Sequence, residues 1–315
     1  MTIVDTESAI VVGIAPGGKV SDGTIAFVVE TAASLQVGVQ LMHVVPTTVG
    51  GPTGTWEVGI AFDQLVAQGQ AGLYSALARF RERADGSVPV EAALVRGGVV
   101  ANLVERSRTA ELLVLERRHL KGWERFTSGS ITAGVAAHAH APVVSVPAGW
   151  SSRPGKRPVI VAVEDAKRAA SEIWTALGLA VARGLPVRLL RVAYVPQAYQ
   201  ELLRREVEVE DFLVVAREEL VRDAQLPAVV VERVPCTFEA RWGEPAEALV
   251  AASRASSVIV LARRDPTLPF GSHLGPVVRR VLRDAECPVM VVEPALQEQV
   301  MVATASAGRA EPAVG

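Results

Sequence analysis

The chain has 315 residues, half of them hydrophobic and 21% charged, with a net charge of −2. This composition is typical of folded globular domains, and it argues against nucleic acid or an anionic membrane as the partner. No apolar run reaches the roughly 18 residues of a membrane span, and the two cysteines lack metal-ligand spacing, so we expect a cytoplasmic protein without structural zinc or disulfides.

Apolar runs alternate with amphipathic stretches through the first half of the chain. Unbroken runs of Val, Ile and Leu predict buried strands, and apolar residues at 3.6-residue spacing predict the helices between them. The predicted strands are 9–15, 39–45, 88–95, 111–115 and 142–146. The predicted helices begin near residue 22 and then cover 62–84, 99–107 and 130–139.

The second half repeats this pattern. AELLVLERRH (110–119) resembles SSVIVLARRD (256–265), and APVVSVP (141–147) resembles CPVMVVEP (287–294). Equivalent residues are 146 positions apart, as in Leu115 and Leu261, although the early strands match at a slightly different offset. A repeat of this length indicates a duplicated domain rather than a solenoid unit. We predict a first copy at 1–148, a linker at 149–157, a second copy at 158–295 with its long helix at 199–223, and a mobile tail at 296–315.

Continuous apolar strands separated by helices predict a parallel sheet covered on both faces. Each copy is therefore expected to be a doubly wound α/β domain with right-handed crossovers. Ligands of such sheets bind outside the carboxyl ends of the strands, where the strand order reverses.

Five strands per copy, a glycine before the third helix (RGG, WGEP) and the ending LVL-RR…GS…(A/C)PVV-V resemble the universal stress protein family. The resemblance covers nearly the whole chain as two tandem copies. It implies Rossmann-like, flavodoxin-like sheets of order 3-2-1-4-5. It also implies pairing through the exposed edge of strand five, either between the two copies of one chain or in a homodimer, because an unpaired apolar edge needs a partner.

Many members of that family bind ATP through Gly-x2-Gly-x9-Gly-Ser/Thr after strand four, and they place an Asp at the end of strand one. The matching positions of the first copy are Ala15, Glu116, His119, Gly129 and Ser130. Those of the second copy are Glu164, Ala262, Asp265, Gly275 and Pro276.

These departures weaken the expected nucleotide site. Glu116 and Asp265 put carboxylates where glycine would let the backbone approach a phosphate, and each opposes the charge of a triphosphate. Pro276 removes a backbone N–H at the start of a helix. We therefore predict that the second copy has lost the nucleotide site and that the first keeps only the helix start.

Two interpretations of the first copy stay open. Arg117, Arg118 and His119 make its loop basic, and with the helix start at Ser128, Gly129 and Ser130 they would form an anion site. Alternatively, the loop is solvated and Ser128 is only an N-cap.

Other polar residues give weaker signals. His138 and His140 are two apart, so they do not share a helix face and make a poor metal-ligand pair. Glu164 and Asp165 could bind a cation or belong to a solvated turn that starts a helix. Trp242 could line the crevice or lie between the two copies.

The resemblance implies a stress-response protein that binds or regulates rather than catalyses. We expect no catalytic residues, no bound metal and no tight ATP binding, with an unidentified regulatory protein as one kind of partner. The alternative is a tandem universal stress protein that still binds ATP or a related nucleotide.

Overall fold

The computed structural model describes residues 8–47, 55–118, 124–152, 155–194, 209–264 and 273–294, with the backbone alone at 55–61 and 124–130. The predicted tail at 296–315 lies outside these residues. None of the helices within these ranges is both long and apolar enough to span a bilayer.

The first copy alternates strands and helices as predicted. Its apolar runs form central strands and its amphipathic stretches form the crossover helices. The elements are β1 (Ala9–Gly13), α1 (Asp22–Leu35), β2 (Gly38–Val45), α2 (Thr55–Ala84), β3 (Val90–Arg96), α3 (Val99–Arg106), β4 (Ala110–Arg117), α4 (Glu124–His138) and β5 (Val143–Pro147).

The second copy follows the same sequence of elements and adds two short helices. These are η1 (Ala166–Arg168), a 3-10 helix, and α8 (Ala228–Arg233), neither of which the sequence predicted. The other elements are β6 (Val159–Ala162), α5 (Ala170–Arg183), β7 (Val187–Ala193), α7 (Val209–Ala224), β8 (Cys236–Trp242), α9 (Pro245–Ser253), β9 (Val258–Ala262), α10 (Pro276–Asp284) and β10 (Val289–Val292).

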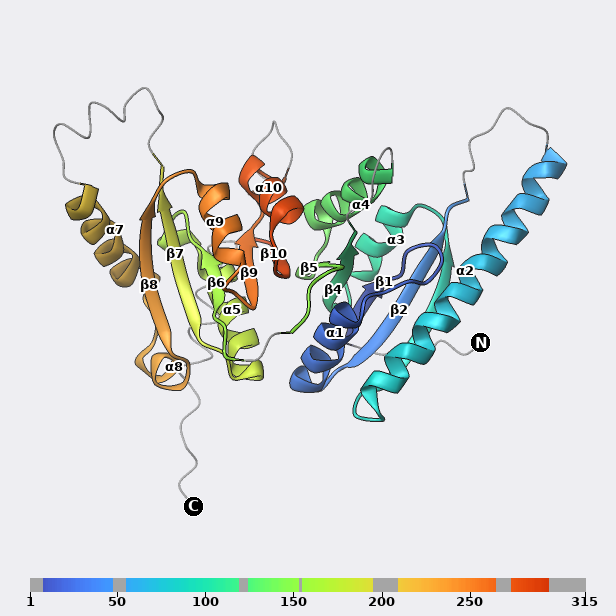
Figure 1. Cartoon of the computed structure of the whole chain (residues 1–315), viewed down its shortest axis with the longest axis horizontal. Helices are drawn as coiled ribbons and strands as arrows, with labels where there is room; N and C mark the ends of the chain where they lie inside the picture. The colour runs from blue at the N-terminus through green and yellow to red at the C-terminus, as the bar shows by residue number, and fades with distance from the viewer. Residues whose placement is uncertain are drawn as a thin grey trace, which may run out of the picture.

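All ten strands form one sheet in the order β3-β2-β1-β4-β5-β10-β9-β6-β7-β8. Each copy therefore has the order 3-2-1-4-5, which is the order that the family resemblance implies. Strands within a copy are parallel, whereas β5 and β10 pair antiparallel, with Met290 opposite Val144. The two strand-five edges thus pair with each other inside one chain, at the middle of the molecule (Figure 1).

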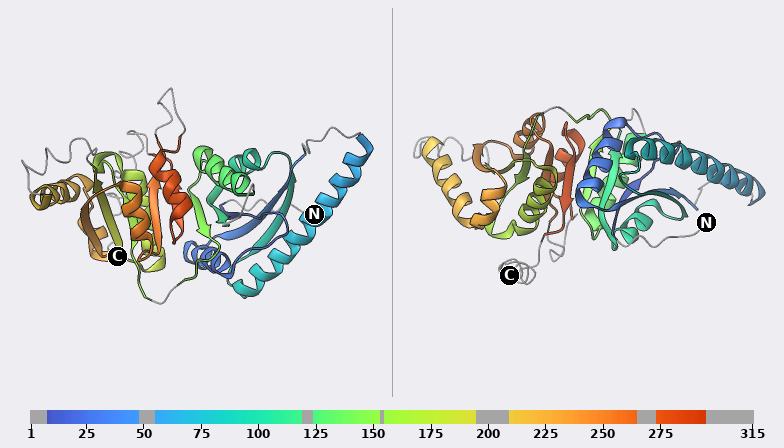
Figure 2. Two further views of the ribbon diagram at one scale, coloured as in Figure 1. Left: turned by 45° about the horizontal axis from the view of Figure 1, so that its top comes forward. Right: turned by 90° about the horizontal axis from the view of Figure 1, so that it is seen from below.

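Helices cover both faces of this sheet, and each face has one hydrophobic core that runs through both copies. One core joins α1, α2, α5 and α7, through buried residues such as Phe27, Phe80 and Leu177. The other joins α3, α4, α9 and α10, through residues such as Leu103 and Val281. Helices α2 and α7 lie at the two far ends of the molecule (Figure 2).

The antiparallel seam sets the relation between the copies. Because β5 and β10 run in opposite directions, the carboxyl edge of the first copy lies on the same side as the amino edge of the second. Each copy's strand-four end consequently faces the last helix of the other copy.

Two predicted helix starts in the first copy are wrong. Helix α2 begins at Thr55 rather than near residue 62. We expected the last helix of the first copy to begin at Ser130, but α4 begins at Glu124. Its counterpart α10 begins at Pro276, the equivalent position to Ser130, as predicted. The first copy therefore extends this helix by six residues, from 124 to 129, where the second has none in its described range.

Candidate functional site

The crevice at the carboxyl edge of the first copy lies between β1 and β4, where the strand order reverses. Glu116, near the end of β4, points its carboxylate at the start of α1. Its Oε2 accepts a hydrogen bond from the Ser21 backbone N–H at 2.6 Å and another from the Thr24 hydroxyl at 2.9 Å. Its Oε1 pairs with the Arg118 guanidinium at 3.1 Å, and only 9% of the Glu116 side chain is exposed.

Glu116 therefore supplies the anion that a helix N-terminus favours. Ser21 is the N-cap of α1, and its own hydroxyl accepts the Thr24 N–H. The free N–H groups and the dipole at such a helix start attract negative charge. A carboxylate held there by three partners takes a position that a phosphate would otherwise find favourable.

The turn after β1 is also closed. Ala15, the predicted position of the strand-one acid, is exposed, and its carbonyl oxygen accepts the Gly18 N–H at 3.1 Å. Gly18 has φ +67°, and a Cβ there would lie 2.0 Å from the Gly72 carbonyl oxygen. Helix α2 thus packs directly on the turn, and no acid is available there to bind a ribose.

The sequence analysis missed His43, which lies in β2 close to this turn. Its Nδ1 lies 2.8 Å from the Ile14 carbonyl oxygen, and the side chain is buried. Its ring packs so closely on Gly69 that a Cβ on that glycine would come within 2.6 Å. The only sequence signal was a histidine in a mostly apolar strand.

The proposed helix start at Ser128, Gly129 and Ser130 is not a helix start. These residues lie inside α4, more than one turn from its first residue Glu124. Backbone N–H groups at that depth bond to carbonyls of the preceding turn rather than to a ligand. The N-cap role predicted for Ser128 is wrong for the same reason. His119, which belongs to the same predicted site, lies outside the described residues.

The Arg117 side chain is directed toward the second copy. Its two Nη atoms donate to the carbonyl oxygens of Leu282 and Ala285, at the C-terminal end of α10. Burial lowers the pKa of the Arg117 guanidinium, and the nearby Asp284 carboxylate partly offsets this. The residue that we assigned to an anion site therefore joins the two copies.

Arg263, 146 positions later, makes the equivalent contact in the opposite direction. Its Nη1 donates to the Ala137 and Ala139 carbonyl oxygens, at 2.9 and 3.0 Å, at the end of α4. Its Nη2 pairs with Glu293, and the side chain is buried. In both RR pairs, 117–118 and 263–264, it is the first arginine that contacts the other copy. The repeated motif therefore marks a reciprocal contact between the copies.

The carboxyl edge of the second copy has no buried carboxylate equivalent to Glu116 among its described residues. Ala262 ends β9 with no carboxylate, and Pro276 is the first residue of α10 after the N-cap Gly275. Glu164 is exposed, and Asp165 caps η1 by accepting the Lys167 N–H at 3.1 Å, which favours the solvated-turn interpretation. Asp265 lies outside the described residues.

Glu172 is a second residue that the sequence analysis missed. It lies in the first turn of α5, the position that Thr24 occupies in α1, and it is only 6% exposed. Burial raises its pKa to about 7, and its Oε2 has no hydrogen-bond partner. A glutamate in a first helical turn reads as a surface residue, so no sequence signal pointed to its burial.

The remaining candidates have structural roles. His138 is exposed and packs edge-to-face on His273 of the other copy, with ring centroids 5.2 Å apart. Trp242 ends β8, the outermost strand of the second copy, and packs on Phe212 of α7. Its suggested place between the copies is therefore wrong. Within the described ranges, no group of three or more His, Cys, Asp or Glu residues could hold a metal ion.

Comparison with known proteins agrees with this architecture. The model of the universal stress protein family matches the chain twice, at residues 8–147 and 156–293. Universal stress protein Rv1996 of Mycobacterium tuberculosis is 23% identical, with 92% of this chain and 96% of that protein covered. Universal stress protein Rv2005c of the same organism is 26% identical, with 90% and 97% covered.

Solved structures show the same fold over the full length. A universal stress protein from Archaeoglobus fulgidus has a TM-score of 0.62 at 15% identity and covers 92% of this chain and 97% of its own. Protein PA1789 of Pseudomonas aeruginosa, described as functionally unknown, has a TM-score of 0.55 at 14% identity, with 98% of both chains covered.

Proposed function

The chain belongs to the universal stress protein family, and from this premise we propose that it is a binding or regulatory module that does not bind ATP tightly. The observation that carries the proposal is the position of Glu116. Its carboxylate accepts two hydrogen bonds at the start of α1 and pairs with Arg118, at the crevice where the family resemblance places the phosphates.

Electrostatics supports this proposal. A triphosphate entering the crevice would meet a carboxylate held nearby, at a cost of about 1 kcal/mol per close charge pair in water and more where water is excluded. It would also have to displace three existing partners of Glu116. Binding of a phosphate therefore gains less here than at a helix start with free N–H groups.

The second copy supports the proposal through a different residue. Pro276 is the first residue of α10 and has no N–H to donate to a phosphate. Gly275 alone of the family glycines remains among the described positions of this copy. Neither copy therefore combines a glycine-lined approach with a free helix start.

The weak anion site of the first copy stays a prediction, but fewer of its predicted residues are free to contact an anion. Arg118 pairs with Glu116, and Arg117 is engaged by the second copy. Because 128–130 lie inside α4, their backbone N–H groups are not available, and His119 with the Ser128 and Ser130 hydroxyls would have to supply the remaining contacts. We expect only weak, salt-sensitive binding of phosphate there, with little preference for a base.

Calorimetry with ATP on the full chain tests the proposal. We expect no saturable binding at millimolar nucleotide, which corresponds to a binding free energy of about −4 kcal/mol or weaker. The variant Glu116→Gln removes the charge but keeps an acceptor, and it should raise ATP affinity about fivefold if repulsion is the main obstacle. Glu111→Gln, at the exposed amino end of the same strand, is the matched control and should change nothing.

Micromolar ATP binding by the unaltered chain, or nucleotide released when the purified protein is denatured, would overturn the proposal in favour of the nucleotide-binding alternative. If Glu116→Gln gains no affinity while the unaltered chain also fails to bind, the missing glycines rather than the carboxylate exclude ATP.

Location and partners complete the proposal. We place the protein in the cytoplasm, supported by Cys236 and Cys287, which are both free thiols. A regulatory protein is the proposed kind of partner. We assign it a binding role without a cofactor and without catalysis.

A further inference from the structure

A cleft of about 300 Å³ lies between the two copies, under the segment that connects them. Its walls come from the end of β5, from residues 149–152, 155 and 157 of the connecting segment, and from the amino-edge loops of the second copy around 253–257 and 284–287. This cleft is separate from the crevice at Glu116, which does not line it. Its volume is at the lower end of the range for small-molecule sites.

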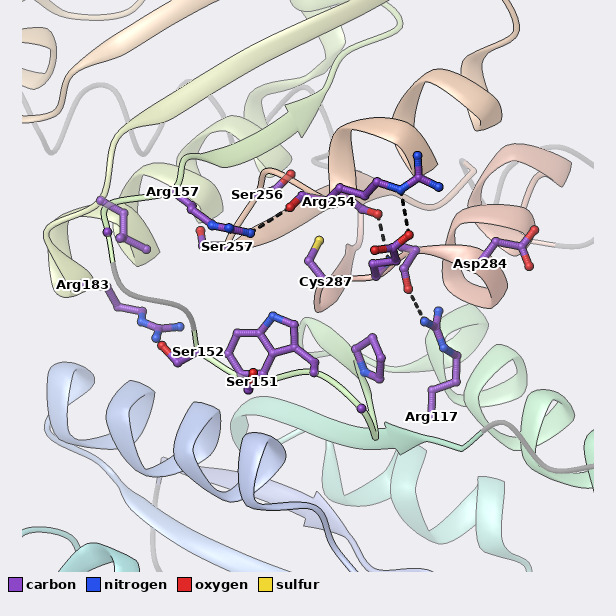
Figure 3. A pocket seen from close by; sticks show the side chains of 18 residues that line it. Arg117, Ser151, Ser152, Arg157, Arg183, Arg254, Ser256, Ser257, Asp284 and Cys287 are labelled. Atoms are coloured by element: carbon purple, nitrogen blue, oxygen red, sulfur yellow. Dashed lines mark hydrogen bonds and ion pairs between the residues drawn. The ribbon is translucent and has the colours of Figure 1, made fainter.

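Four arginines line the cleft, and two of them have buried N–H groups without a partner. The Arg183 guanidinium uses Nη2 to pair with Glu30 at 2.9 Å, whereas its Nη1 is buried and unpaired. The Arg117 guanidinium uses both Nη atoms on α10, whereas its Nε is buried and unpaired. Figure 3 shows these two side chains approaching the cleft from opposite sides.

Unpaired buried donors are rare in folded proteins because each costs about 1–3 kcal/mol. Burial lowers the pKa of both guanidinium groups, which reflects the cost of taking these charges out of water. An anion in the cleft would offset the cost of burying these two charges.

The remaining lining is polar and carries a net positive charge. Arg157 and Arg254 add two more guanidinium groups, against the carboxylates of Asp284 and Glu286. Glu30, which pairs with Arg183, adds a third carboxylate beside the cleft, so four positive and three negative charges leave an excess of one. The Cys287 thiol adds no charge, because burial raises its pKa to about 12. Five serines complete the lining. The hydroxyls of Ser253, Ser256 and Ser257 already donate to backbone carbonyl oxygens, so Ser151 and Ser152 are the serines that can donate to a ligand.

We propose that this cleft binds a small ligand that carries a phosphate group. A phosphate monoester has a charge of about −1.5 to −2 at neutral pH, opposite in sign to the excess charge of the cleft, and it has three acceptor oxygens for the arginines and for the Ser151 and Ser152 hydroxyls. Arginine suits this ligand because its guanidinium is always charged and its fork of N–H groups fits phosphate geometry.

Such a ligand would contact both copies and the segment between them. Arg117 belongs to β4 of the first copy, Arg183 to α5 of the second, and Ser151 to the connection. Binding would consequently stabilise the pair of copies as a unit, and the connecting segment would report occupancy. This inference names a ligand at a different site from Glu116, so it stands or fails independently of the proposed loss of ATP binding.

Inorganic phosphate is the probe for the test, with succinate as the carboxylate comparison. Titration of the full chain, followed by calorimetry and by the NMR amide signals of Ser151 and Ser152, should show saturable phosphate binding at about millimolar affinity or tighter. Succinate should bind at least tenfold more weakly. Tighter binding of succinate than of phosphate would overturn the choice of ligand.

Two variants localise the binding. Arg183→Lys keeps the charge but loses the second Nη. Arg157→Ala removes a side chain whose one described hydrogen bond is to the Arg254 carbonyl oxygen. Each should weaken phosphate binding at least tenfold. Because Arg183 also pairs with Glu30, Arg157→Ala keeps the test valid if Arg183→Lys unfolds.

Two arginine variants outside the cleft are the controls. Arg108→Ala removes an exposed arginine of the first copy, and Arg222→Ala removes an exposed arginine of the second. Both should leave phosphate binding unchanged. Absence of saturable binding, or binding reduced by Arg222→Ala as much as by Arg157→Ala, would contradict the proposal.

Discussion

Glu172 is a carboxyl group whose burial has a measurable consequence for stability. Burial raises its pKa from an ordinary 4.5 to about 7 in the folded protein, so the folded state binds this proton more tightly than the unfolded state does. Its contribution to stability is therefore complete below pH 4.5 and is lost as pH rises through 7. The shift corresponds to at most about 3 kcal/mol.

We expect Glu172→Gln to stabilise the protein at pH 8, by up to about 3 kcal/mol, and to have little effect at pH 5. Glutamine is neutral at both values, so the variant removes the cost of ionising a buried group. Urea unfolding at the two pH values measures the difference. Glu164→Gln, which changes an exposed carboxylate nearby, should show no such dependence, and an equal effect of both variants would refute the explanation.

Ser145 is a polar side chain placed at the seam between the copies. It is fully buried in β5 opposite Val289, and its hydroxyl has no hydrogen-bond partner. The equivalent residue of β10, 146 positions later, is Val291. We expect Ser145→Val to raise the free energy of unfolding by about 1 kcal/mol, because it replaces an unsatisfied hydroxyl with an apolar group.

Ser253→Ala is the comparison for this prediction. Ser253 is also buried, but its hydroxyl donates to the Val250 carbonyl oxygen and accepts the Glu286 N–H at 2.8 Å. Removing it should lower stability by about 1–2 kcal/mol. A loss of stability in Ser145→Val as well would show that the Ser145 hydroxyl is satisfied or that the seam is too tight for valine.

At the scale of elements, the reciprocal arginines connect the strands of one copy to the helices of the other. Arg117, at the end of β4, donates to the C-terminal carbonyls of α10, and Arg263, just after β9, does the same for α4. A positive charge at a helix C-terminus is favourable because it offsets the helix dipole and satisfies free carbonyls. The two contacts therefore stabilise both ends of the seam.

We expect Arg263→Met to lower the free energy of unfolding by about 2–3 kcal/mol, because buried carbonyls lose a charged donor. Arg117→Met should cost a similar amount, and the two losses should not simply add, since both act on one seam. Chemical denaturation of the single and double variants measures this. Arg264→Met, the exposed next residue, should have almost no effect; a comparable loss there would mean that the arginine contacts contribute little.

At the scale of the whole molecule, the two cores make the copies one cooperative unit. Each core contains residues of both copies, such as Phe27 with Leu177 on one face and Leu103 with Val281 on the other. We expect one urea transition, with coincident curves from circular dichroism and tryptophan fluorescence. Two separated transitions would show that the copies unfold independently.

The seam also predicts the oligomeric state. Both strand-five edges are already paired inside the chain, so neither is free to join a second copy. Sedimentation should therefore give a monomer of 33.3 kDa. A dimer that persists at low micromolar concentration would indicate that another surface, such as the outer strands β3 and β8, pairs between chains.

Much of the fold was predictable because its causes are local or repeated. Unbroken apolar runs such as 112–115 predict buried strands, and the 146-residue repeat predicts two similar units. The start of α4 was not predictable, because Gly129 and the serines beside it favour a helix end by local propensity, and that preference was overridden. The roles of Arg117 and Glu172 were hidden because their partners and neighbours lie far away in the sequence.

The sequence alone therefore determined the class of fold, the duplication and the absence of the family glycines, because these depend on side-chain periodicity and on residue identity. Only the tertiary structure decided where the charges go. In the tertiary structure Glu116 binds the start of α1, Arg117 and Arg263 each bind the last helix of the other copy, and Glu172 is buried. The physical reason is that a charged side chain binds whatever donor or acceptor the packed sheet brings within reach, and the antiparallel β5–β10 pairing, rather than any local pattern, fixes which groups those are.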